Sequence, residues 1–286
     1  MKKKEKSAQL AGRHADIFRC PICGADMHVR EQASLVCRNA HAFDFAKQGY
    51  VNMLNKPVKT QYDKALFEHR HAFITESGFY QALHTAIAET VGQMTGESSL
   101  KVLDAGSGEG SHLAGIMSHI DGADAVGVGV DIAKDGIMMA AKHYPEQLWL
   151  VGDLADLPIA DAKSDVILNI LSPASYDAFN RVLAPGGRVI KVVPGADYLK
   201  ELREALYQGT DKARYDNADT VALFEAQYGP FERVHIKEQV PLDEAALRHL
   251  CGMSPLAWNQ APGELDDFIT QAQTVTLDLE ILIGHK

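Results

Sequence analysis

The stretch Val102-Leu-Asp-Ala-Gly-Ser-Gly-Glu-Gly-Ser111 decides the fold of this chain. Its first residues are strand-like, and three glycines follow at positions 106, 108 and 110. A helix is predicted to begin near Ser111. A turn without side chains lets a ligand lie against backbone N–H groups at a helix N-terminus. The spacing lacks the third glycine of the dinucleotide pattern GxGxxG. The pattern therefore indicates a ligand-binding turn, but not the turn of the dinucleotide-binding motif.

Strand-like and helical segments alternate around this turn. Strands are predicted over 101–104, 124–131, 148–151, 164–171 and 188–193, with two late antiparallel strands over 231–240 and 272–283. Helices are predicted over 80–94, from 111 onward, and over 132–143, 174–182 and 197–208. Such alternation is typical of a mostly parallel α/β sheet. We expect seven strands in a domain over residues 79–286.

Acidic residues end three of the predicted strands. Asp104 precedes the glycine turn, and Asp131 ends the next strand, where it suits two ribose hydroxyls. Asp131 could instead cap the helix that follows it. Asp153 and Leu154 follow the third strand, where an acid can accept from an adenine amino group and the next backbone N–H can meet the ring. Alone, Asp153 would read as a loop acid, but the three acids together indicate adenosine binding.

The fourth strand ends in Asn169-Ile-Leu-Ser-Pro-Ala-Ser175. Substrates of open α/β sheets bind at the carboxyl edge of the strands. Asn169 is therefore our candidate catalytic residue, oriented toward the reacting group. The alternative is an ordinary strand end followed by a helix cap at Ser172-Pro173.

A second cluster lies near the N-terminus. Three of the four cysteines and one histidine follow zinc-ligand spacing: Cys20, Cys23, Cys37 and His41. Short strands over 27–30 and 34–37 are expected to form a hairpin between the two ligand pairs. The cluster predicts a small zinc-binding module over residues 17–55. A module of this size buries too little apolar surface to fold without metal.

The net charge of −10 over 286 residues is unevenly distributed. Residues 1–64 hold 12 Lys+Arg against 6 Asp+Glu, and the remainder holds 16 against 32. A basic N-terminal part favours a polyanion partner. We expect residues 1–16 to be a flexible leader and residues 56–78 to be a linker that enters a helix near 67–74. Metal-type cysteine spacing favours a reducing cytoplasm over a disulfide framework.

These motifs together resemble the RlmA family of 23S rRNA (guanine-N1) methyltransferases. The similarity covers the zinc set, the segment Phe43–Leu54, the loop Leu103–Gly110 and the segment Met253–Trp258. The residues after Pro173 are closer to the Gram-positive-type branch of that family. The resemblance implies a class I, Rossmann-like methyltransferase domain behind the zinc module, with S-adenosylmethionine and Zn²⁺ as cofactors.

The resemblance also implies partners and contacts. Cofactor contacts are expected from the following residues in addition to the acids above: Tyr80, Gly106, Gly108, Glu109, Gly110 and Tyr198. The expected partners are a 23S rRNA hairpin in large-subunit domain II and a second copy of the chain. Two other functions stay open on the residues alone. One is a small-molecule methyltransferase with a structural zinc, and the other is a non-catalytic RNA- or antibiotic-binding protein with a vestigial cofactor pocket.

Overall fold

The body of the molecule is an eight-stranded sheet with the order β10-β11-β9-β8-β5-β6-β7-β4. The computed structural model describes residues 2–56, 58, 60–94, 99–120, 125–207, 215–258, 263 and 265–286. The strands are β4 (Val51–Asn52), β5 (Leu100–Ala105), β6 (Ala125–Asp131), β7 (Leu148–Val151), β8 (Ser164–Ile170), β9 (Leu183–Pro194), β10 (Glu232–Pro241) and β11 (Thr274–His285). β11 is antiparallel to both of its neighbours, and all other neighbouring strands are parallel. The mostly parallel α/β sheet is thereby confirmed.

The strand count differs from the expected seven. The eighth strand, β4, comes from the N-terminal region and pairs in parallel with β7, with Val51 opposite Leu150 and Asn52 opposite Val151. β4 is only two residues long, which is too short for a periodic sequence pattern to predict a strand there. Asp124 and Gln208, expected as the ends of a strand and a helix, lie outside the described residues.

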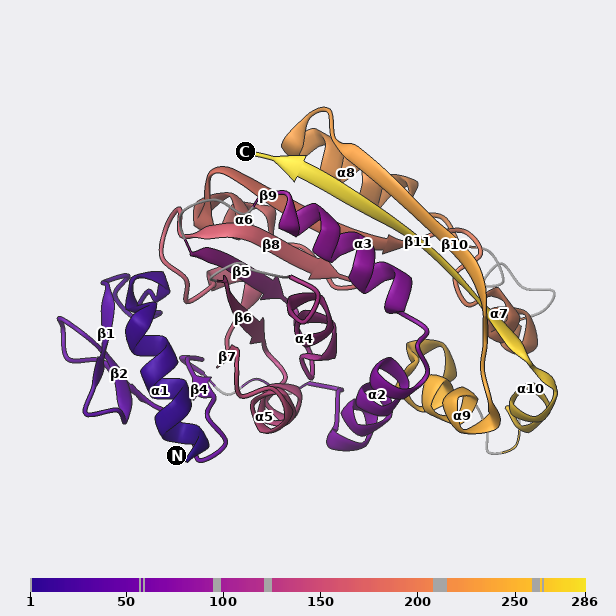
Figure 1. Cartoon of the computed structure of the whole chain (residues 1–286), viewed down its shortest axis with the longest axis horizontal. Coiled ribbons are helices and arrows are strands. Elements are labelled where there is room, and N and C mark those ends of the chain that lie inside the picture. Colours follow the sequence, from indigo (N-terminus) through magenta and orange to yellow (C-terminus); the bar gives the residue numbers. More distant parts are fainter. Residues whose placement is uncertain are drawn as a thin grey trace.

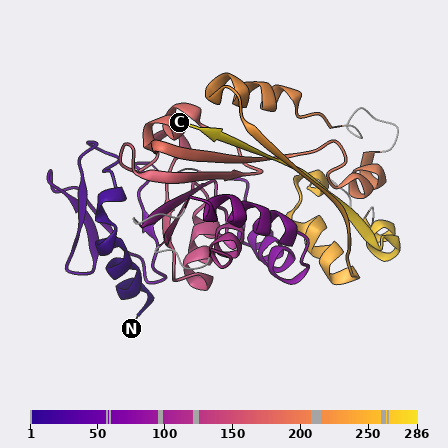
Figure 2. The same cartoon turned by 45° about the horizontal axis from the view of Figure 1, so that its top comes forward.

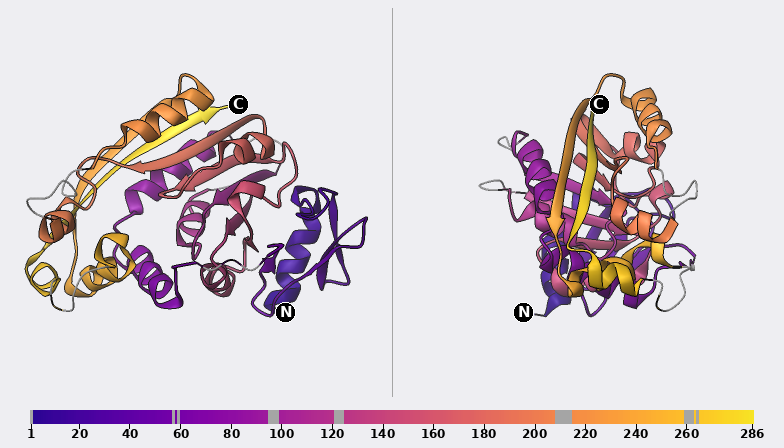
Figure 3. Two further views of the ribbon diagram at one scale, coloured as in Figure 1. Left: turned by 180° about the vertical axis from the view of Figure 1, so that it is seen from behind. Right: turned by 90° about the vertical axis from the view of Figure 1, so that its right-hand side faces the viewer.

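Helices cover both faces of the sheet (Figures 1 and 3). One face packs against α3 (Gln81–Gly92), α4 (Ser111–Met117) and α5 (Lys134–His143), and the other against α6 (Tyr176–Val182) and α8 (Ala218–Tyr228). Side chains of the central strands alternate between the two apolar clusters. Val166 and Leu168 belong to one cluster, and Ile167 between them belongs to the other. This two-residue alternation, apolar on both faces, is what a buried parallel strand requires.

The remaining helices lie at the end of the sheet opposite the zinc-binding region (Figures 1 and 2). They are α7 (Lys200–Tyr207), α9 (Glu244–Met253) and α10 (Asp266–Gln271). α2 (Lys64–Glu76) packs closely on α9 and confirms the helix expected near 67–74. The sequence patterns did not predict α8, α9 or α10. No helix in the described part of the chain is both long and apolar enough to cross a membrane.

The N-terminal region forms a small antiparallel sheet of β1 (Met27–Arg30), β2 (Ser34–Cys37) and β3 (Ala42–Asp44). The β1–β2 hairpin is as predicted, with Met27 opposite Cys37. This region is bonded to the larger sheet by its backbone as well as by β4. The Arg19 N–H donates to the Pro158 carbonyl, and the Ala160 N–H donates to the Ile17 carbonyl.

The expected flexible leader is wrong. Residues Lys3–Arg13 form helix α1, which buries Ser7, Ala8 and Ala11. The Ser7 hydroxyl donates to the Gly49 carbonyl, and Ala8 and Ala11 pack in the same cluster as β6 and β7. The buried side chains of this helix are all small, so the sequence shows no apolar stripe of the usual kind.

Because α1 is packed, a buried charge on it should be costly. We expect Ala11→Glu, at a position with no exposed surface, to lower the free energy of unfolding by more than about 2 kcal/mol. Gln9→Glu, on the exposed side of the same helix, is the matched control and should change it little. Urea unfolding of both variants measures this. Equal midpoints would mean that α1 is not docked in solution.

Candidate active site and metal centre

The glycine turn between β5 and α4 is built from residues in the left-handed region of φ. Gly106, Gly108 and Gly110 have φ values of +93°, +57° and +84°. A side chain at Gly106 or Gly110 would also clash with neighbouring side chains. A Cβ on Gly110 would lie 2.4 Å from the buried ring of Trp149, and a Cβ on Gly106 would lie 2.1 Å from the Ser172 hydroxyl. The turn therefore requires glycine. Its N–H groups are bonded within the protein: those of Gly106 and Ser107 donate to the Val130 carbonyl, and that of Gly110 donates to the Ser107 carbonyl.

Two of the predicted acids flank this turn. The Asp131 carboxylate accepts hydrogen bonds from the Gly108 N–H at 2.8 Å and the Ala133 N–H at 2.7 Å. It thus fixes the turn and also supports the start of α5, and burial raises its pKa. Asp104 is buried, and its Oδ1 atom has no hydrogen-bond partner among the described residues. Burial raises the pKa of Asp104 to about 8, although nearby Arg70 opposes this rise.

The third acid is placed differently. Asp153 is exposed, and its carboxylate accepts from the Ala155 N–H at 2.9 Å. Its neighbour Leu154 reaches the glycine turn, because its Cδ1 atom lies 3.7 Å from where a Cβ on Gly106 would stand. The structure therefore brings Leu154 to the same edge of the sheet as Asp104 and Asp131, with Asp153 on the solvent side.

Tyr80 and Tyr198 meet although 118 positions separate them. Their hydroxyl oxygens are 2.6 Å apart. Tyr80 is buried at the start of α3, and Tyr198 lies in the loop after β9. Asp278 of β11 holds this loop, because its Oδ2 accepts from the Asp197 N–H at 2.8 Å. Burial raises the pKa of both tyrosines, so both hydroxyls stay protonated and can donate.

Asn169 does not lie as expected. It is fully buried, its Nδ2 donates to the carbonyls of Ala105 and Pro173, and its Oδ1 accepts from Lys191 Nζ at 2.6 Å. Its amide is therefore engaged within the protein and is not free to hold a substrate. The physical reason is that Asn169 and Lys191 face each other across β8 and β9. Asn169 positions the strand-four segment instead, whose Ser172 does lie over Gly106.

No sequence motif indicated two cations of this region. Arg70 of α2 forms an ion pair with Glu109, with 2.6 Å between Nε and Oε2. Lys191 is buried in β9 and also donates to the Ser172 carbonyl at 3.1 Å. Burial lowers the pKa of Lys191 to about 8. For Lys191, the sequence did offer one signal, because a lysine interrupts the otherwise apolar strand 189–193.

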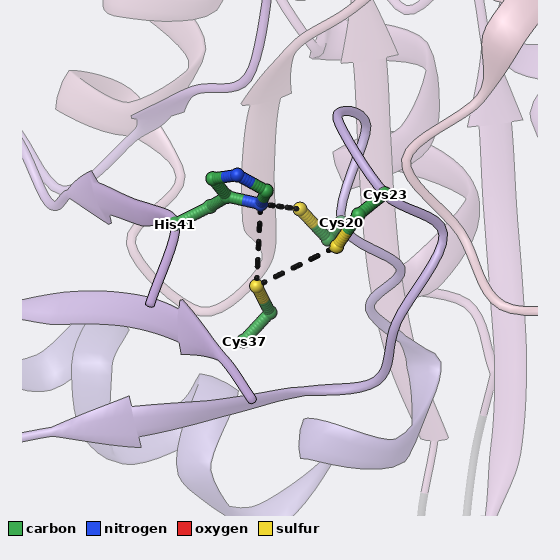
Figure 4. A group of neighbouring side chains, drawn as sticks. All are labelled: Cys20, Cys23, Cys37 and His41. Carbon is green, nitrogen blue, oxygen red and sulfur yellow. Dashed lines mark hydrogen bonds between the residues drawn. The ribbon is translucent and has the colours of Figure 1, made fainter. Parts of the chain in front are cut away.

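The four predicted metal ligands converge between the two turns of the N-terminal sheet (Figure 4). The ligand atoms of Cys20, Cys23, Cys37 and His41 all lie within 4.8 Å of one another. His41 Nδ1 is 3.5 Å from the sulfurs of Cys20 and Cys37, and the sulfurs of Cys23 and Cys37 are 3.7 Å apart. A tetrahedral zinc ion with ordinary bond lengths implies edges of about 3.6 Å for S···N and about 3.8 Å for S···S. The donor set and its spacing fit zinc.

Local backbone bonds hold these ligands. The Gly24 N–H donates to the Cys20 carbonyl, and Cys37 and His41 are joined by the Cys37 N–H and the His41 carbonyl. Gly24 and Ala40 have positive φ, as tight turns require. A hydrogen bond from the backbone of Ala25 lowers the pKa of the Cys23 thiol to about 6, which favours the thiolate form that binds a metal.

Basic side chains surround this centre. Arg30, Arg38 and Lys47 are exposed on the N-terminal region, whereas Arg19 is partly buried and lies 3.4 Å from the Asp156 carboxylate. The three exposed cations are available to a phosphate backbone.

Comparison with known proteins follows the same division of the chain. A family described as "RlmA, N-terminal", a zinc ribbon, matches residues 18–64, and a methyltransferase domain family matches residues 102–187. A Bacillus subtilis (strain 168) protein, provisionally named as a 23S rRNA (guanine-N1) methyltransferase, is 41% identical over 275 residues, covering 94% of this chain and 97% of that protein. The 23S rRNA (guanine(748)-N1) methyltransferase of Streptomyces fradiae is 34% identical, covering 87% and 88%.

The fold also has solved relatives. A structure concerned with the conversion of a disulfide bond into a thioacetal group during echinomycin biosynthesis covers 78% of this chain and 90% of that one, with a TM-score of 0.50 and 13% identity. At this identity the likeness concerns the fold alone.

The metal centre predicts a defined metal content. We expect the purified chain to hold one zinc ion per molecule, and Cys20→Ala combined with Cys23→Ala to lose it, because two of four ligands are removed. Cys251→Ala removes a buried thiol outside the centre and should leave the zinc in place. Elemental analysis after dialysis measures this. Equal zinc in the double variant and the control would refute the assignment.

Proposed function

We propose that this chain, which belongs to the RlmA family of 23S rRNA (guanine-N1) methyltransferases, transfers the methyl group of S-adenosylmethionine to N1 of a guanine in 23S rRNA. The observation that carries this function is full-length similarity to the rRNA enzymes, including 41% identity to the Bacillus protein. The zinc centre and the glycine turn occur together in this one chain. A small-molecule methyltransferase and a non-catalytic binding protein are not favoured, because the similarity extends through the zinc-binding region.

For the cofactor we propose the following contacts. Asp131 retains free lone pairs beside its two backbone bonds and accepts the ribose hydroxyls. Asp153 and Leu154 hold the adenine, and the glycine turn with Glu109 lies along the methionine part. Asp104 supports this proposal directly, because an unpartnered buried carboxylate oxygen suits a cationic ligand group.

The chemistry divides simply between cofactor and protein. When bound, S-adenosylmethionine supplies an activated methyl group and its own leaving group. The protein then mainly positions the reactants. Ser172 stands over Gly106, so the strand-four segment forms one wall beside the cofactor turn. Lys191 and Asn169 hold that wall through the Ser172 and Pro173 carbonyls. We propose that the Tyr80–Tyr198 pair closes the end of the cofactor site that lies opposite this wall.

We propose that the zinc-binding region binds the RNA. Its exposed cations Arg30, Arg38 and Lys47 bind phosphates, and the zinc ligands hold the surface that carries them. A hairpin in domain II of the large-subunit RNA is the proposed target. We further propose that the enzyme works in the cytoplasm, where ribosomal RNA is found, and that it forms a homodimer.

Asp104 gives a pH-dependent prediction. Its folded-state pKa of about 8 lies above the ordinary value of 3.8, so between these values the folded state binds more protons than the unfolded state. The stability of the wild type should therefore fall as the pH rises through this window. Asp104→Asn removes the cost, so its stability relative to wild type should increase from pH 5 to pH 8.

The same variant should lose most of the thermal stabilisation that S-adenosylmethionine gives the wild type. Urea unfolding at four pH values, with and without the cofactor, measures both effects. Asp161→Asn, at an exposed carboxylate far along the chain from the turn, is the control. A pH-independent difference between Asp104→Asn and wild type would contradict the buried-acid assignment.

RNA binding gives a separate prediction. Arg30→Glu combined with Arg38→Glu should raise the concentration of 23S rRNA needed for half-maximal methylation by about 10-fold or more, because two phosphate contacts become repulsive. Cofactor affinity should be unchanged. Arg248→Glu reverses an exposed charge on α9 and should have little effect. Transfer of radiolabelled methyl to deproteinised RNA measures this, and an unchanged RNA requirement would exclude the proposed surface.

A further inference from the structure

One partly buried cation lies against the glycine turn. Arg70 projects from α2 and has 22% of its side chain exposed, whereas its partner Glu109 has none exposed. The Nε atom lies 3.5 Å from where a Cβ on Gly108 would stand, and Phe67, one turn earlier on α2, lies 3.6 Å from the same point. α2 therefore covers the turn, and Arg70 is its charged contact with it.

The guanidinium of Arg70 is only partly used. Its Nε is paired with Glu109, while its terminal nitrogens Nη1 and Nη2 have no hydrogen-bond partner in the part of the chain that the structure describes. A guanidinium presents five N–H donors in a rigid fork, so Arg70 retains donors that can hold two oxygens at once. Lys191, the other cation near this turn, already donates to the Asn169 side chain and the Ser172 carbonyl.

The side chains around the turn include more acids than cations. Three acids, Asp104, Glu109 and Asp131, surround it. Burial raises the pKa of both aspartates, and the nearby charge of Arg70 opposes that rise. The methionine end of S-adenosylmethionine carries a sulfonium, an ammonium and a carboxylate. The two cationic groups are suited to the acids, and the carboxylate requires a cation of its own.

We propose that Arg70 binds the carboxylate of S-adenosylmethionine through its terminal nitrogens. This inference rests on the proposed function and adds a residue that no motif of the sequence indicates. A purely structural clamp between α2 and Glu109 is the competing role. The two roles differ in one respect: only a ligand-binding arginine discriminates between ligands that differ in the carboxylate.

The experiment compares two ligands by calorimetry with the full-length, zinc-loaded protein. S-adenosylhomocysteine has the carboxylate, and S-adenosyl-3-thiopropylamine is the same thioether without it. We expect the wild type to bind the carboxylated ligand at least about 10-fold more tightly. Arg70→Gln should reduce this ratio to near 1, and Arg70→Lys should retain part of it, since a point charge replaces the fork.

Phe67→Leu is the matched control, because it loosens the same helix without changing charge. It should weaken both ligands alike and keep the ratio. An unchanged ratio in Arg70→Gln would overturn the inference, and so would a wild type that does not distinguish the ligands. These outcomes are distinct from failure of the proposed function, in which the wild type would bind neither ligand. The wild-type ratio tests the inference even if Arg70→Gln does not fold.

Discussion

The hydrogen bond from the Gly108 N–H to the Asp131 carboxylate is the interaction on which the site depends. It ties the turn after β5 to the end of β6, and the N–H groups of Gly106 and Ser107 add two bonds to the Val130 carbonyl. The turn can come this close only because its glycines have no side chains to meet Trp149 and Ser172. The glycine turn, the buried acids and the strand-four segment thus converge at one sheet edge, and the proposed cofactor binding rests on that geometry.

The zinc-binding region is part of the same folded unit rather than an attachment to it. Its residues Ile17, Phe18 and Leu35 belong to the apolar cluster that also holds Val128 and Phe179 of the larger domain. The four zinc ligands lie close together in this region, and β4 adds a strand from the same region to the edge of the large sheet. A rigid connection of this kind sets the distance between the proposed RNA-binding surface and the proposed methyl-transfer site, which would be useful if both act on one RNA.

Local patterns in the sequence predicted the central elements of the large sheet, but not β4, α1, α8, α9 or α10, and not every contact between the elements. The central strands, the glycine turn, the zinc ligands and the β1–β2 hairpin follow from period, spacing and residue type, and all were placed correctly. Helix α1 was missed because its buried residues are small, and Arg70 because it reaches the turn from a helix over thirty residues away in sequence. Asn169 was misread because its sequence position cannot reveal that Lys191 faces it across two strands. Contacts of this kind depend on tertiary packing.

The central claim is methylation of a guanine at N1 in 23S rRNA by this chain. Mass mapping of 23S rRNA from cells with and without the protein tests this, since a methyl group shifts the mass of the one RNase fragment that carries it. We expect one methylguanine that disappears when the protein is absent and returns with the wild-type chain, but not with Asp131→Ala. Identical methylation maps with and without the protein would contradict it.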